Sequence, residues 1–208
     1  MDRRTALRNL SLGLGYTIAS PSIFSLLSSC KTETSTWSAL FFTSEEQYIV
    51  SHLADIILPS SKTPGAIDVN VPQFIDLVFS KIETQTNKGL FKTGTKNFAK
   101  TFKHQFNIDV IDGSKNQIKA HLDTYFNIPT NEKNKVYLLT NRKIKDIEQK
   151  DFQRYSIYKF LLWVKYYTVF GYFTSEEVGE NVLNYDPIPG THIGCMPIED
   201  VPNERLWS

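Results

Sequence analysis

The side chains of this sequence best suited to metal binding or nucleophilic chemistry are two cysteines and four histidines. The sequence contains no H-E-x-x-H, no C-x-x-C, no P-loop and no G-x-S-x-G elbow. His52 and Asp55 lie one turn apart on a predicted helix and are placed to pair, most simply as a surface hydrogen bond. The histidines are otherwise scattered along the chain: His52, His104, His121 and His192.

Cys195 follows Gly194 in a segment rich in Pro and Gly. That setting suits a reactive or metal-binding thiol, but nothing beside it in sequence would activate the thiolate. A structural cysteine is the simpler interpretation. We therefore expect no catalytic, cofactor-binding or metal-binding residue in this chain.

The N-terminus has the pattern of an export signal. Arg3 and Arg4 precede a largely uncharged apolar stretch, which ends in "LSSC" at Cys30. "RRTALR" is similar to a twin-arginine signal, and "LSSC" is similar to a lipobox whose cysteine becomes lipidated. The same residues also fit an ordinary secretory lipoprotein signal. We predict a signal peptide over residues 1–29 and a lipidated tether over 30–42, which would place the protein in the cell envelope, facing the periplasm.

Residues 43–208 are long enough for one domain with a core of its own. Without the predicted signal peptide, Lys plus Arg falls from 23 to 20 and Asp plus Glu from 22 to 21, so the formal net charge is about −1, which argues against a nucleic-acid partner. With Cys30 lipidated, Cys195 has no cysteine with which to form an intrachain disulfide. Stability must therefore come from packing or from a partner.

Helical periodicity runs through most of this domain. "TSEE" at residues 43–46 predicts a capping box that begins a helix, and Pro59 ends that helix. Asn70 is the expected N-cap of a second helix, with Pro72 in its first turn. Two further helices are expected over about 90–106 and 115–126. In the first of these, a lysine face opposes a phenylalanine face. The lysines, Lys92, Lys96 and Lys100, would either be solvated or meet an anionic membrane or partner.

The longest predicted helix runs from about 143 to 170, with Gly171 as its stop. Its second half is apolar almost all round, as in a helix at the centre of a bundle or one covered by another protein. A second "TSEE", at residues 174–177, predicts a capping box before a short helix that ends near residue 183. The predicted fold is an all-α single domain of five or six helices, with long Pro/Gly-rich loops and an irregular C-terminal tail.

Two stretches carry a family resemblance: "ADIILPSSKTPGAIDVNVPQFID" at residues 54–76 and "GYFTSEEVGENVLNYDPIPGTHIGC" at 171–195. Together they resemble the gluconate 2-dehydrogenase subunit 3 family, over roughly residues 40–197. The resemblance implies a small non-catalytic subunit that accompanies an FAD-dependent dehydrogenase of the glucose–methanol–choline type. It also implies that the small subunit's signal takes the folded flavoprotein out of the cytoplasm.

The resemblance further implies a partner interface and a cytochrome or other electron acceptor. The lipobox at Cys30 departs from some members of the family and indicates that this small subunit holds the complex to a membrane through its lipid. We expect the interface among residues that fix loop backbones or supply large aromatic rings. The candidates are Pro64, Gly65, Ala66, Trp163, Tyr172, Phe173, Pro189, Gly190, Gly194 and Cys195. The aromatic candidates also suit the domain's own core. A free-standing ligand-binding lipoprotein is the alternative function, and no nucleophile–base spacing supports an enzyme.

Overall fold

The computed structural model describes residues 37–183, 195, 197 and 199. The chain divides into a unit of residues 1–38 and a unit of residues 39–208, and all the helices described here belong to the second. That unit is all-α, and no strand occurs among the described residues. The described part of this unit forms seven α-helices: α3 (Ser44–Ile57), α4 (Val71–Lys81), α5 (Gln85–Phe106), α6 (Lys115–Phe126), α7 (Thr130–Thr140), α8 (Gln149–Phe173) and α9 (Glu176–Asn181). Two 3₁₀ turns, η1 (Val110–Asp112) and η2 (Ile144–Asp146), lie between them.

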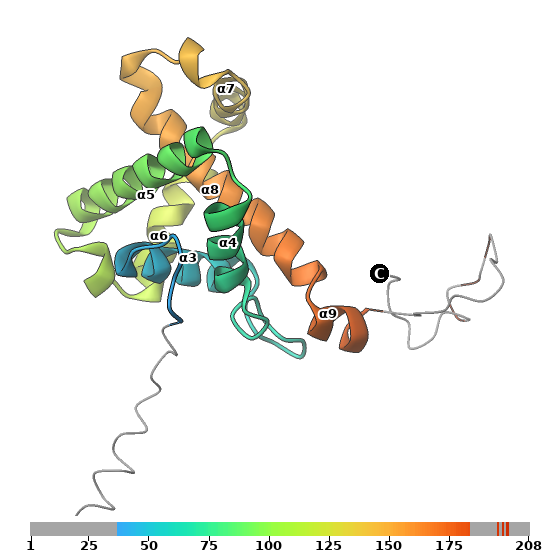
Figure 1. The fold of residues 1–208 in the computed structure, drawn as a ribbon. Helices are drawn as coiled ribbons and strands as arrows, with labels where there is room; N and C mark the ends of the chain where they lie inside the picture. Colours follow the sequence, from blue (N-terminus) through green and yellow to red (C-terminus); the bar gives the residue numbers. More distant parts are fainter. Residues whose placement is uncertain (1–36, 184–194, 196, 198, 200–208) are drawn as a thin grey trace, which may run out of the picture. The chain divides into compact units, whose positions relative to one another are not determined.

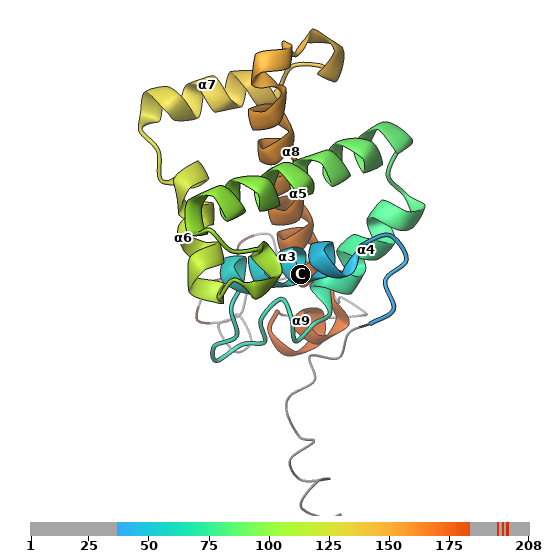
Figure 2. The same ribbon diagram turned by 90° about the vertical axis from the view of Figure 1, so that its left-hand side faces the viewer.

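Helix α8 is the centre of the unit. It packs against α3, α4, α5, α7 and α9, and α5 crosses it in Figures 1 and 2. Helices α7 and α9 lie near its two ends (Figure 1). The core is rich in phenylalanine, and the largest fully buried side chains include Phe79, Phe91, Phe98, Phe102 and Phe160.

The crossing of α5 and α8 depends on Gly94. A Cβ atom at that position would lie 2.3 Å from the carbonyl oxygen of Ser156 and 2.6 Å from Cβ of Phe160. Only the missing side chain lets the two backbones approach so closely. The approach brings Phe91 of α5 against Phe160 of α8, with ring centroids 5.0 Å apart.

The predicted starts of the first two helices are confirmed in position. Thr43 and Glu46 form the capping box of α3, in which each side chain accepts the other residue's backbone N–H. Asn70 is the N-cap of α4 and Pro72 stands in its first turn. Asn70 caps differently from expectation, because its backbone is left-handed (φ 57°) and its side chain makes no capping bond. Its amide oxygen accepts from Nε2 of Gln73 instead.

Two predicted helices begin elsewhere. Helix α5 starts at Gln85, earlier than expected, because the Thr84 hydroxyl accepts the backbone N–H of Asn87 and caps it. Helix α8 starts at Gln149, later than expected, because η2 occupies residues 144–146. Helix α7 was not predicted: none of its residues is buried, so it lacks the apolar stripe by which a helix is read from sequence.

The predicted stop at Gly171 is wrong. Helix α8 continues to Phe173, and Gly171 lies buried within it. A Cβ atom at Gly171 would meet the ring of Phe74 at 2.6 Å, so this glycine serves helix packing.

The second predicted capping box is also wrong. Thr174 is the C-cap of α8, and its hydroxyl donates to the carbonyl oxygen of Phe170. Ser175 is the N-cap of α9 but makes no side-chain capping bond, because its hydroxyl donates backwards to the carbonyl oxygen of Tyr172. Both hydroxyls therefore close the end of α8 rather than open α9.

Candidate functional site

His121 occupies a structural position in the core. His121 is only 2% exposed and lies edge-on to the rings of Phe98 and Phe102. Its ring nitrogens are within hydrogen-bond distance of Thr101 Oγ1 (3.1 Å) and Gln105 Oε1 (2.6 Å). Burial lowers the pKa of this imidazole below its usual value. His121 therefore belongs to the core.

The pairing expected between His52 and Asp55 does not form. Nδ1 of His52 lies 2.9 Å from the carbonyl oxygen of Tyr48, and Asp55 forms an ion pair with Lys115. Within the described residues, no group of three or more His, Cys, Asp or Glu side chains is placed to hold a metal ion. Cys195 is a free, exposed thiol.

A buried carboxylate fastens the start of the domain. Asp76 of α4 accepts the backbone N–H groups of three consecutive residues: Leu40 at 2.7 Å, Phe41 at 3.0 Å and Phe42 at 2.8 Å. Hydrogen bonds from backbone N–H groups to an ionised carboxylate are stronger than those to a neutral acceptor, because the acceptor carries a charge. The strip lies directly before the α3 capping box. Asp76 therefore fixes the point at which the chain enters the helical unit.

Lys92 of α5 secures the same strip from the other side. Its ammonium group donates to the carbonyl oxygen of Phe41 at 2.6 Å, lies 4.0 Å from the ring centroid of Phe41 and forms an ion pair with Glu46. The lysine face expected on this helix is therefore divided. Lys92 makes contacts within the fold, whereas Lys96 and Lys100 are exposed.

Four of the residues expected at a partner interface form an internal joint between the loop after α3 and the end of α8. The Tyr172 hydroxyl donates to the carbonyl oxygen of Pro64 at 2.9 Å. Gly65 and Ala66 are both buried. A Cβ atom at Gly65 would lie 2.4 Å from the backbone nitrogen of Ser60, so the loop leaves no room for a side chain there. These residues therefore make contacts inside the fold and fix the position of the loop against α8.

The other expected interface residues are distributed differently. Trp163 is half-buried, with its ring 5.8 Å from that of Phe79, whereas Phe173 is exposed. The remaining candidates, like the signal residues Arg3, Arg4 and Cys30, lie outside the described residues: Pro189, Gly190 and Gly194. Phe173 is thus the candidate that the structure places in the open on α8.

An exposed apolar face runs along the last three turns of α8. We call it the α8 face, and its residues are Leu162, Tyr166, Val169, Phe170 and Phe173. They repeat at spacings of three and four, so they form one stripe. The Tyr166 and Phe170 rings stack, with centroids 6.0 Å apart and planes 8° from parallel. Sequence reasoning recognised a helix that is apolar all round but could not say which side is left uncovered.

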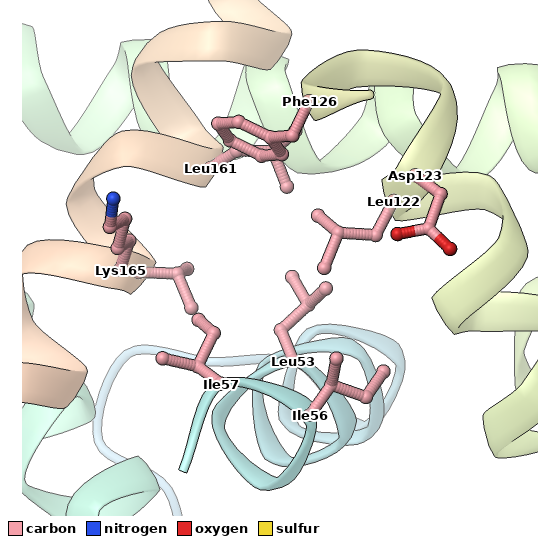
Figure 3. A pocket seen from close by; sticks show the side chains of 9 residues that line it. Leu53, Ile56, Ile57, Leu122, Asp123, Phe126, Leu161 and Lys165 are labelled. Carbon is pink, nitrogen blue, oxygen red and sulfur yellow. The ribbon is translucent and has the colours of Figure 1, made fainter.

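An apolar pocket of about 300 Å³ lies between α3, α6 and α8. In Figure 3, side chains from these three helices surround it, and Lys165 and Asp123 stand on opposite sides. Most of its lining is aliphatic or aromatic: Leu53, Ile56, Ile57, Leu122, Phe126, Leu161 and Val164. Its size is at the lower end for a small-molecule site and suits one large side chain equally well.

Comparison with known proteins places the chain in a family. Among the helices of the described region, none has the length and apolar character that crossing a bilayer requires. Searches of curated proteins and of solved structures returned no match. A family model described as gluconate 2-dehydrogenase subunit 3 matches residues 44–190, which span α3 to α9 and most of the chain. The chain therefore belongs to the gluconate 2-dehydrogenase subunit 3 family, whose name describes a subunit of a dehydrogenase.

Proposed function

We propose that this chain is a non-catalytic accessory subunit of an FAD-dependent sugar or sugar-acid dehydrogenase of the glucose–methanol–choline type. In this role it is the export escort, folding partner and lipid anchor of the flavoprotein subunit. The family match over residues 44–190 is the observation that carries the proposal. The twin-arginine pattern at Arg3 and Arg4 supports the export role, and the lipobox pattern at Cys30 supports the anchor.

The proposal divides the work between two chains. The flavoprotein binds FAD and oxidises the substrate, and it takes up its cofactor before export, which requires a route for folded proteins. This chain supplies the export signal and the lipid, and it holds the complex of the two chains at the envelope membrane, facing the periplasm. Electrons leave the flavoprotein for a cytochrome or another acceptor, with no redox centre in this chain on the path.

Escort and anchor both require a firm connection between the N-terminal segment and the helical unit. The contacts of Asp76 and Lys92 hold residues 40–42, at the start of the helical unit, in place. The flavoprotein is then held through the helical unit.

A free-standing ligand-binding lipoprotein is the second candidate function. The observation that favours it is the apolar pocket between α3, α6 and α8. Such a protein would purify as a stable, colourless monomer. An accessory subunit would purify with a yellow partner.

The first test is a pull-down of tagged, detergent-extracted chain from its native cells, followed by an absorption spectrum. Flavin bands and a large co-eluting subunit are expected, and a colourless monomer would sink the proposal. The export role is tested by the double variant Arg3→Lys/Arg4→Lys, which should trap dehydrogenase activity in the cytoplasm. Arg8→Lys is the matched control, because Arg8 belongs to the same basic region but stands outside the arginine pair.

A further inference from the structure

The geometry points to the α8 face, with the adjoining pocket, as the surface on which the flavoprotein subunit docks. This inference rests on the proposed function and deepens it by naming the side of the molecule that meets the partner. It shares Phe173 with the interface predicted from sequence and adds four residues of α8 that the prediction did not name: Leu162, Tyr166, Val169 and Phe170.

The same side of α8 is covered near the start of the helix and exposed near its end. Tyr155 lies seven residues, or about two turns, before Leu162 and therefore on the same side. Tyr155 is buried and donates to the carbonyl oxygen of Arg142, just after α7. Tyr158 is likewise buried and donates to the carbonyl oxygen of Tyr125 on α6. From Leu162 onward, the described residues place no helix over this side of α8.

The exposed apolar area is bordered by α4 on one flank and by the apolar pocket on the other. On one flank, Phe170 meets Phe74 of α4, with ring centroids 6.0 Å apart. On the other flank, Lys165 stands one turn from both Leu162 and Val169 and also lines the pocket. The area is therefore an apolar stripe beside a cavity, and a protruding side chain of a partner fits the cavity. Buried anchors in pockets dominate the energetics of protein interfaces.

Charged side chains surround the α8 face. Lys159 lies one turn before Leu162, at the start of the stripe, and Lys165 lies on one flank of it. Lys159 sits over the ring of Trp163 at 5.3 Å, and Lys165 has no ion-pair partner in the described part of the chain. Beyond Phe173, α9 presents three exposed carboxylates: Glu176, Glu177 and Glu180. A fitting partner surface has an apolar centre, an acidic group beside the lysines and a basic group opposite α9.

The family assignment decides between possible occupants. A subunit of a dehydrogenase has a second kind of chain as its obligatory neighbour, and a face this apolar suits such a lasting contact. A second copy of this chain and its own residues 184–208 are the other possible occupants. The experiment tests both, and finding either one on the α8 face would overturn the inference.

The test compares two tyrosine-to-aspartate variants in the complex of the chain with its flavoprotein. Tyr166→Asp places a charge in the middle of the α8 face, and Tyr137→Asp makes the same change on α7. The two tyrosines are similarly exposed, at 59% and 68%, so both variants should fold. The readout is flavin absorbance per tagged chain after pull-down, with circular dichroism to confirm the helices.

We expect Tyr166→Asp to lower the recovered flavin by at least about tenfold and Tyr137→Asp to leave it unchanged. Lys165→Glu should weaken recovery at low salt and less so at high salt, because its charge acts across solvent. Should Tyr166→Asp unfold, Phe173→Ser probes the same face more gently.

The outcomes distinguish a failure of the proposed function from a failure of the proposed docking surface. If the unaltered chain recovers no flavoprotein, the proposed function fails, and this inference with it. If the unaltered chain recovers flavoprotein and Tyr166→Asp recovers as much, the assignment of the α8 face as the docking surface is refuted. The proposed function as an accessory subunit then still stands. Light scattering on the isolated chain checks for a second copy, since a dimer that Tyr166→Asp dissociates would overturn the assignment. A chain lacking residues 184–208 checks the tail: if Tyr166 then becomes more accessible to chemical labelling, the tail is the occupant.

Discussion

The carboxylate of Asp76, in the middle of α4, accepts the backbone N–H of Phe42 at 2.8 Å across 34 residues of sequence. Asp76 is 2% exposed, and its hydrogen bond to Phe42 is buried, whereas those to Leu40 and Phe41 are partly buried. A buried carboxylate is costly unless it is fully hydrogen-bonded, and here three backbone N–H groups bond it. Residues 40–42 are therefore an integral part of the helical unit.

Replacing this carboxylate should loosen the entry of the chain. We expect Asp76→Asn to reduce the free energy of unfolding by about 3 kcal/mol, because the amide offers one acceptor oxygen and sets donors against donors. Urea denaturation measures the change. Asp123→Asn is the matched control, since Asp123 forms only an exposed ion pair with Lys119 and should cost less than about 0.5 kcal/mol. Equal losses in the two variants would contradict the role of Asp76.

Two glycines of α5 should respond in opposite directions to the same substitution. Gly94→Ala forces a methyl group against Ser156 and Phe160 and should destabilise the fold by about 2–3 kcal/mol. Gly89→Ala meets nothing within 4 Å and should stabilise it by about 0.5–1 kcal/mol through helix propensity. Thermal unfolding of both variants is the measurement. A stabilised Gly94→Ala would mean that the α5–α8 crossing is looser than described.

His121 should make the fold sensitive to mild acid. Burial lowers the pKa of its imidazole in the folded state, so below about pH 6.5 the unfolded chain binds a proton that the folded chain resists. Stability should therefore fall as the pH drops from 7 to 5, with a slope of up to about 1.4 kcal/mol per pH unit.

The variant His121→Gln tests this assignment, because glutamine retains hydrogen-bonding groups near Thr101 and Gln105 without titrating. Urea midpoints measured from pH 7 to pH 5 should vary less in the variant than in the unaltered protein. If the two proteins show the same dependence on pH, other groups produce the effect.

The lipid anchor makes a prediction of its own. Cys30→Ser removes the residue that we propose is lipidated and should move the chain and its flavoprotein from the membrane fraction to the soluble periplasmic fraction. Cys195→Ser removes the only other cysteine and should leave both proteins in the membrane fraction. Dehydrogenase activity and an immunoblot of each fraction give the readout. Membrane retention of Cys30→Ser would place the attachment elsewhere.

The sequence by itself determined the features that depend on near neighbours. The α3 capping box joins Thr43 and Glu46 across three residues, and Pro59 stops that helix by its own geometry. The all-α class followed from helical periodicity, and membership of the family followed from residues 54–76 and 171–195. These features need no knowledge of what packs where.

Only the tertiary structure decided the features that depend on contacts distant in sequence. Gly171 read as a helix stop, but the ring of Phe74 on α4 makes it a packing position inside α8. Likewise, the pattern of α8 is apolar on every side, and the placement of α4, α5, α6 and α7 selects which side stays bare. A residue's type and spacing fix its local conformation, whereas burial is set by the elements that share its surroundings. For that reason the sequence indicated a helix that something must cover, and the fold alone located the face from Leu162 to Phe173.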